Sequence, residues 1–298
     1  MKKIVLIICC ISLSTNLFSQ DLEDILNDEI QESSSIVRGT FKGTRIMNGH
    51  SVETREKGVL DFLISHRFGR INSGIDEFFG LDDSNIRFGL EYSVTDNLVV
   101  AIGRSSFEKT YDGYIKYQIL YQKEGEDDFP VSMTLFTSAT EKTLKDYDPE
   151  DKPTFANRLT YTSQVLVARK FNPNFSLQIM PTYIHFNTVP STADPNNMFA
   201  MGVGTRVKVS NRISLSGEYY YNFNPLESID STNSLALGVG IETGGHIFQL
   251  IFTNSRSMLE KGFIAETTGE FFNGDIHFGF NISRAFHLVK DEEEEKLY

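Results

Sequence analysis

Residues 198–223, MFAMGVGTRVKVSNRISLSGEYYYNF, decide the fold because their side chains alternate between two kinds. One set is apolar and takes every second position: Phe199, Met201, Val203, Val207 and Val209. The set between them is small or charged: Gly202, Gly204, Arg206 and Lys208. A period of two is that of a β-strand. A soluble sandwich would bury the apolar set in a protein core, whereas a membrane barrel would turn it toward lipid.

The same alternation recurs along the chain from residue 58 and predicts twelve strands separated by turn signals. We expect strands at 58–68, 85–94, 98–107, 113–122, 130–141, 157–171, 175–187, 197–210, 213–223, 233–243, 246–255 and 275–286. Twelve is an even number, as in bacterial single-chain outer-membrane barrels.

The connections between these strands alternate in length. Tight or fairly short ones, at 95–97, 123–129, 172–174, 211–212 and 244–245, mostly carry Asn, Asp, Gly or Pro, the residues that turn geometry demands. Most of the others are longer and polar. This order is typical of an up-and-down barrel with short periplasmic turns and longer outside loops.

Three features favour a membrane barrel over a soluble one. The strands are close to the 9–11 residues that cross a bilayer. Their second faces combine glycine with charge, which suits a crowded wet lumen. Aromatic residues gather near strand ends, as Tyr219, Tyr220, Tyr221 and Phe223 do, where interfacial girdles form. The predicted fold is therefore all-β, a single antiparallel transmembrane barrel spanning residues 57–287.

The first residues predict export from the cytoplasm. Lys2 and Lys3 precede an apolar run that ends at Leu13, and a polar stretch then ends in small Ser19, which is the layout of a secretory signal. We expect a signal peptide at residues 1–19. Both cysteines of the chain lie inside it, so the mature protein has no thiol or disulfide.

Composition excludes other classes. After the signal, no apolar run approaches the length of a transmembrane helix. A net charge of −12 without a visible basic patch argues against a nucleic-acid partner.

A few places fit the barrel poorly. In strand 246–255, Ile247 and Ile251 fall on the predicted lumen face. Pro181 interrupts strand 175–187, so we expect a bulge or strand end there. Arg104 and Arg284 share the lipid-facing parity, which is tolerable only near an interface.

Both ends of the mature chain lie outside the predicted barrel. Residues 20–56 begin with the acidic stretch DLEDILNDEIQESSS. They are expected to form a periplasmic lead-in or a segment tucked into the lumen. Residues 288–298 are expected to form a solvated acidic tail.

The motifs GTRIMNGHSVE (43–53) and FLISHRFG (62–69), with GDIHFGFNISRAF (274–286) at the end, support a family resemblance. From about Gly39 to Phe286 the chain resembles an uncharacterised family of outer-membrane β-barrel proteins from Bacteroidota-type bacteria, a domain of unknown function. The resemblance implies a barrel in the bacterial outer membrane and carries no substrate or catalytic residue.

No catalytic or metal-binding constellation is visible. The six histidines are scattered singly, without paired ligand spacing. Ser65 and His66 are adjacent in a strand and therefore point to opposite faces. We expect no enzyme and no cofactor.

The charged residues of the inward face are the candidate functional residues. The candidate lumen-lining set is Arg87, Glu91, Lys116, Arg206, Lys208, Glu218 and Glu242, with Asp61 and Arg67 on the first strand. They either fill the interior with ion pairs or line a path and select solutes.

Two functions follow from these alternatives. The first is a passive channel or porin-like transport barrel for small solutes with the charged lumen as its filter. The second is a structural barrel, without conductance, whose loops or N-terminal segment bind a periplasmic or extracellular protein. Outer-membrane lipid is the expected surrounding in both.

Overall fold

A computed structural model of the chain describes residues 35–145, 152–243 and 245–289, in two units. The predicted signal peptide, residues 1–19, and most of the predicted acidic tail lie outside the described residues. The described part of the smaller unit is residues 35–38 and 121–130. In it, strand β1 (Ser35–Ile36) pairs antiparallel with β6 (Lys123–Glu124).

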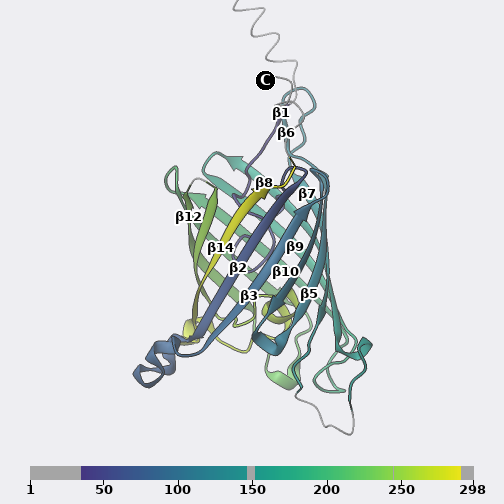
Figure 1. The fold of residues 1–298 in the computed structure, drawn as a ribbon, viewed down its shortest axis with the longest axis vertical. Helices are drawn as coiled ribbons and strands as arrows, with labels where there is room; N and C mark the ends of the chain where they lie inside the picture. The colour runs from purple at the N-terminus through teal and green to yellow at the C-terminus, as the bar shows by residue number, and fades with distance from the viewer. Residues whose placement is uncertain (1–34, 146–151, 244, 290–298) are drawn as a thin grey trace, which may run out of the picture. The chain divides into compact units, whose positions relative to one another are not determined.

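The larger unit is a closed antiparallel barrel of twelve strands (Figure 1). Its strands are β2 (Val59–Arg70), β3 (Ser84–Ser93), β4 (Leu98–Ser105), β5 (Tyr111–Leu120), β7 (Ser132–Glu141), β8 (Leu159–Asn172), β9 (Phe175–Phe186), β10 (Asn197–Lys208), β11 (Ile213–Asn222), β12 (Ser234–Thr243), β13 (His246–Thr253) and β14 (His277–His287). Each strand pairs with the next along the chain, so the topology is an up-and-down meander. The predicted fold class is confirmed.

The barrel closes between its last and first strands. β14 pairs with β2 in an antiparallel register that includes Ile282↔Ile64 and Ser283↔Leu63. Closure leaves no strand edge with unpaired N–H and C=O groups, which is the condition for crossing lipid with strands. The two strands at the seam are separated by almost the whole barrel sequence, so the pairing is strongly non-local.

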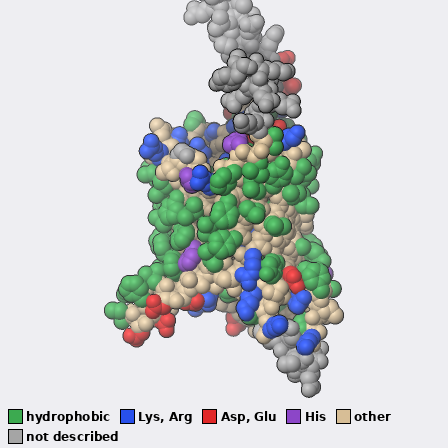
Figure 2. All heavy atoms as spheres, in the orientation of Figure 1, with side chains coloured by type: hydrophobic (Ala, Val, Ile, Leu, Met, Phe, Trp, Pro, Cys, Tyr) green, Lys and Arg blue, Asp and Glu red, His purple; other side chains and the backbone are tan. Residues whose placement is uncertain are grey.

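The wall has an apolar outer face and a buried inner one, as the alternation predicts. Along β2, accessibility alternates at every residue, with Asp61, Leu63, Ser65 and Arg67 buried. Large apolar side chains such as Ile102 remain exposed on the outside. Figure 2 shows these hydrophobic side chains as a band over the barrel wall, with charged side chains gathered beyond it. Such a band matches the lipid-facing surface of a transmembrane barrel.

Pro181 introduces neither the bulge nor the strand end that we expected, since β9 continues to Phe186. On either side of it, the pairs Gln164↔Thr182 and Val167↔Ile179 keep one register between β8 and β9. The pairing to β10 also runs through Met201↔Pro181 without a shift. The missing N–H of proline removes local pairs but leaves the register intact, because the flanking ladders fix it.

Several loops between the strands contain short helical turns. They are η1 (Ile71–Ser73), η2 (Ile75–Gly80), η3 (Phe107–Lys109), η4 (Ala156–Arg158), η5 (Glu227–Ile229), η6 (Lys261–Ala265) and η7 (Phe271–Asn273). Among the described residues, no helix is both long and apolar enough to cross a membrane.

The two outward arginines lie near strand ends. Arg104 lies over the ring of Tyr111 at 5.2 Å, and Arg284 lies over Phe286 at 4.8 Å. These cation–π contacts give each guanidinium a partner at the depth where an aromatic girdle meets water.

Candidate functional site

Residues 40–53, which precede β2, lie inside the barrel. We call residues 40–53 the strap. Inside it, Ile46 N donates to Gly49 O at 2.9 Å and Ser51 N donates to Thr44 O at 3.0 Å, which makes a tight hairpin. Ten consecutive strap residues, 43–52, are buried. The strap is thus a folded element, held against the inner wall by the contacts described below.

Glu218 of β11 holds the tip of the strap. Its carboxylate accepts the backbone N–H groups of Asn48 at 2.7 Å, Gly49 at 3.1 Å and Met47 at 3.3 Å. Hydrogen bonds to a charged group stabilise by about 1.5–3 kcal/mol each. Glu218 was predicted to line the lumen, and the structure places it under the strap.

Wall amides pair with the strap backbone on the other sides. Gln178 of β9 accepts from Val52 N at 2.7 Å and donates to His50 O at 2.8 Å. Gln249 of β13 donates to Ile46 O at 2.7 Å, and Asn281 of β14 donates to Met47 O at 2.8 Å. These bonds take the place of the ladder that an isolated hairpin lacks.

Charged and hydroxyl groups of further strands complete this set. Lys116 Nζ of β5 donates to Glu53 O at 2.7 Å, and Thr134 of β7 donates to Val52 O at 2.7 Å. Arg67 of β2 donates to the side-chain oxygen of Asn48 at 2.7 Å. The strap is therefore tied to strands spread around the whole barrel.

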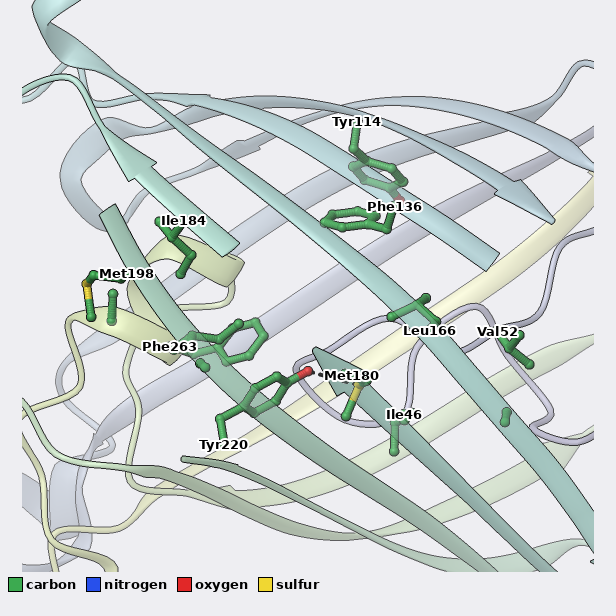
Figure 3. Close-up of a cluster of buried hydrophobic side chains, with 14 of the residues drawn as sticks. Ile46, Val52, Tyr114, Phe136, Leu166, Met180, Ile184, Met198, Tyr220 and Phe263 are labelled. Carbon is green, nitrogen blue, oxygen red and sulfur yellow. Dashed lines mark hydrogen bonds between the residues drawn. The ribbon is translucent and has the colours of Figure 1, made fainter. Parts of the chain in front are cut away.

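Apolar contacts with the strap explain why β13 carries apolar residues on its lumen face. Ile251 of β13 is buried with Met47 and Ala236, and a Cβ at Gly43 would lie 3.2 Å from Ile247. The apolar residues on the lumen side of β13 therefore meet the strap. A larger apolar cluster lies inside the barrel and joins Ile46 and Val52 to wall residues (Figure 3). Two of these wall residues are Tyr220 and Met180, and the Tyr220 hydroxyl donates a hydrogen bond to the Met180 sulfur.

A second segment enters the barrel from the opposite end. We call residues 254–269, which follow β13, the inserted loop. The sequence predicts an outside loop here, but residues 257–265 are buried. Phe263 packs on Tyr220 with ring centroids 5.3 Å apart, and Asn222 of β11 donates to Ile264 O at 2.7 Å. The expectation of an outside loop is wrong for this part, because its apolar residues find partners inside the wall.

The strap and the inserted loop meet at one carboxylate. Glu260 Oε1 lies 3.1 Å from Arg45 Nη1 and 3.4 Å from His50 Nε2. The His50 ring also packs against Tyr114 and Phe136, with centroids 4.6 and 4.2 Å away. Arg45, His50 and Glu260 are all buried. We call this contact the latch, since it is an ion pair between two elements that enter from opposite ends.

The remaining lumen candidates form ion pairs and hydrogen bonds in place of a bare pore lining. Arg87 binds Asp112 through Nε at 3.0 Å and Nη2 at 2.5 Å, and Glu91 accepts from Tyr114. Asp61 pairs with Arg55 at 2.8 Å. Glu242 joins Arg206 at 3.3 Å to Lys42 at 3.0 Å. Lys208 lies near the end of β10 and is half-buried.

The two ends of the lumen differ in free space. Toward the short turns, around Arg206, Glu242 and Gln249, the cavity between strap and wall measures about 10 Å³, barely the space of one water. Toward the long loops a cavity of about 850 Å³ is lined by residues of several loops and of the inserted loop. We call it the vestibule. Of these two cavities, the large one thus lies at the long-loop end and the small one at the short-turn end.

Sequence reasoning found the wall charges but missed their partners. Arg45, His50 and Glu260 were not among the candidates. The pair Asn48-Gly49 is a hairpin turn signal and could have indicated a folded element in this region. Nothing local marks Glu260 as a lumen residue, because its loop reads as an ordinary polar connection. Within the described residues, no group of three or more His, Cys, Asp or Glu is arranged to hold a metal ion.

A closed twelve-stranded barrel with an apolar outer band and a filled polar lumen defines a class, the membrane-spanning β-barrels. The chain belongs to the membrane bound beta barrel domain family DUF5777, whose pattern matches residues 41–286. This family is uncharacterised. The membership confirms the predicted membrane barrel and supports the predicted location in the bacterial outer membrane.

Solved structures with a similar fold include other outer-membrane barrels. The KdgM porin in complex with disordered oligogalacturonate is 6% identical and has a TM-score of 0.45, covering 77% of this chain and 99% of that chain. An outer-membrane channel from Pseudomonas putida F1 is 13% identical, with a TM-score of 0.46 and coverage of 79% and 98%. Outer membrane phospholipase A from Escherichia coli, as an active-site variant, is 12% identical, with a TM-score of 0.42 and coverage of 79% and 93%. Comparison with curated proteins gave no match.

Proposed function

We propose that the protein is a gated channel for small polar solutes, closed in the described state by the strap and the inserted loop. The observation that carries the proposal is the pair of inserted segments, which meet at the Arg45–Glu260 latch below an open vestibule. A solute entering from the long loops would first meet the inserted loop, which carries Glu260 of the latch.

The polarity of the packing supports displacement of the strap. Beside the apolar contacts of Ile46, Met47 and Val52, the strap makes many hydrogen bonds to wall side chains, including Glu218, Gln178 and Gln249. When such a bond is exchanged for bonds to water, the net loss is only about 0.5–1.5 kcal/mol for a neutral pair. A wet lumen could therefore accept the wall groups after the strap has moved, whereas a wholly apolar core could not.

A second candidate is a barrel without conductance that binds a partner protein. The observation in its favour is that the predicted filter residues are occupied: Arg87 binds Asp112, and Glu218 binds the strap. In that case the ion pairs serve to brace the wall. The bacterial group of the sequence resemblance stays a prediction under either function.

Conductance in a planar bilayer distinguishes the two. We expect wild-type protein to be mostly closed and Glu218→Ala to open far more often, because the strap tip loses its acceptor. The matched control is Glu141→Ala, which removes a wall carboxylate that pairs with Arg158 and not with the strap. If Glu218→Ala forms a folded barrel and stays as silent as the control, the channel proposal fails and the partner-binding function is favoured.

A further inference from the structure

The vestibule has the size and lining of a binding site. Its volume of about 850 Å³ falls within the range of small-molecule sites. Its walls come from loops that are distant in sequence, including Asp83, Glu108, Lys142, Ile229 and Thr267. A pocket assembled from several loops at the mouth of a barrel is a common place for a ligand.

Several charged side chains in and beside the vestibule pair with one another, while Arg70 of the lining pairs with Asp275 at 3.3 Å and Glu77 also lines the cavity. Lys142 lies 3.1 Å from Glu108, and Lys261 bridges Glu108 at 3.3 Å and Glu266 at 2.7 Å. Although burial opposes it, the neighbouring lysines hold the pKa of Glu108 below its ordinary value. Burial raises the pKa of Glu266, which the nearby Lys261 opposes. With both carboxylates ionised, the two lysines and the two glutamates of this chain sum to zero charge.

The lining contains a further ion pair, between Arg256 and Asp83. Arg256 lies 2.7 Å from Asp83, and its guanidinium lies over the ring of Phe107 at 5.4 Å. A charged ligand would have to break one of these pairs before gaining one of its own. These paired positions therefore disfavour strongly anionic or cationic ligands.

Besides the ionisable residues Arg70, Glu77 and His277, the rest of the lining consists of hydroxyl groups, an amide, backbone and some apolar surface. The hydroxyl and amide residues are Ser73, Ser255, Ser257, Thr267, Thr268 and Asn254. Hydroxyl and amide groups both donate and accept, and paired carboxylates keep free lone pairs for further donors. A hydroxyl that already donates within the chain, as Thr267 does to Phe263 O at 2.8 Å, still offers a lone pair to a ligand hydroxyl group.

We propose that the vestibule binds a neutral polyhydroxylated solute of the size of a di- or trisaccharide. The proposal deepens the proposed function and rests on it, since this solute would be the one that the channel admits. Ser257, Gly262 and Glu266 of the lining belong to the inserted loop that carries Glu260. A bound solute therefore touches the element that holds the latch.

Isothermal titration of the full chain in detergent tests the proposal with defined probes. The neutral probes are maltotriose, cellotriose and raffinose, and the charged probes are trigalacturonate and trilysine. We expect at least one neutral sugar to bind with a stoichiometry of one and at least tenfold more tightly than either charged probe.

Two tryptophan variants locate the site. Thr268 is exposed and lines the vestibule, so Thr268→Trp fills the space without touching the ion pairs and should weaken binding at least tenfold. Asn157→Trp places the same ring on an exposed loop residue outside the lining and should bind as wild type does. Failure of all three sugars, tighter binding of a charged probe, or equal affinity in Thr268→Trp would overturn the proposal. Because titration needs no conductance, sugar binding by a silent barrel would refute only the channel.

Discussion

At the scale of single residues, Glu218 matters most, because one buried carboxylate fixes three backbone N–H groups at the strap tip. We predict that Glu218→Ala weakens strap docking by about 3 kcal/mol, on the order of a hundredfold in the population of undocked strap. Trypsin cleavage after Arg45, followed by mass spectrometry, measures that population. Cleavage at the wild-type rate in a folded variant would show that Glu218 does not hold the strap.

Asp194 gives a pH prediction in the long loops. The Ser228 hydroxyl and the backbone N–H groups of Ser228 and Ser191 hold the pKa of Asp194 below its ordinary value. A lowered folded-state pKa contributes stability that is present above the unfolded value of about 3.9 and is lost as pH falls through the folded value.

We therefore predict that the Ser228 amide is protected from hydrogen exchange at pH 6 and loses this protection as pH falls through the lowered pKa of Asp194, after correction for intrinsic exchange. Asp194→Ala, which removes the acceptor, should lack the protection at pH 6 already. Equal protection in the variant and the wild type at pH 6 would contradict the role of the carboxylate.

The sequence predicts which strand side chains point into the barrel, but it does not predict which groups they bind there. Arg87, Glu91 and Lys116 face inward because strand alternation dictates it. Their bonds depend on Asp112, Tyr114 and the strap backbone, which come from other elements. No local pattern encodes such a contact, because it forms only after the barrel closes.

At the scale of elements, the strap has little space to spare. A Cβ at Gly49 would lie 2.3 Å from the Tyr220 hydroxyl oxygen, so any larger residue there must move the strap or the ring. We predict that Gly49→Val leaves the barrel folded and exposes the strap to trypsin at Arg45.

Gly113→Val is the matched control for this change. A Cβ at Gly113 meets only the Ala101 carbonyl oxygen at 3.6 Å, and Gly113 lies on the wall away from the strap. Its strap should remain protected. If both valine variants show the same protection, Gly49 is not required by the close approach of the strap to Tyr220.

The predicted strand boundaries match the observed ones to within a residue where the alternation ends at turn residues, as for β9 (Phe175–Phe186). Some of the other predicted and observed boundaries differ by more. β5 begins at Tyr111, two residues before the predicted start. The burial of the inserted loop could not be predicted from sequence, because its apolar stretch Phe263-Ile264-Ala265 is too short to show a period. Its burial is decided by the lumen, which is a property of the closed barrel.

At the scale of the whole molecule, the apolar outer band and the seam between β14 and β2 predict a heat-modifiable barrel that needs detergent. We predict that unboiled protein migrates differently from boiled protein on a denaturing gel. Leu63→Pro, which removes an N–H from β2 beside the seam pair with Ser283, should abolish the unboiled form. Identical migration of the wild type in both states would argue against a closed barrel.

The chain without its predicted signal has no cysteine, so a single engineered disulfide can test whether strap movement opens the lumen. A Cβ at Gly204 would lie 3.7 Å from Ile46 Cγ1, so cysteines at these two positions would bring their side chains together, and a disulfide forms where the Cβ atoms are about 3.5–4.5 Å apart. The most direct measurement is the conductance of the variant Ile46→Cys, Gly204→Cys, Glu218→Ala before and after a reductant is added. The gated-channel account predicts a silent oxidised barrel that begins to conduct when the disulfide is reduced, and conductance that is equal in both states, or absent from both, would contradict it.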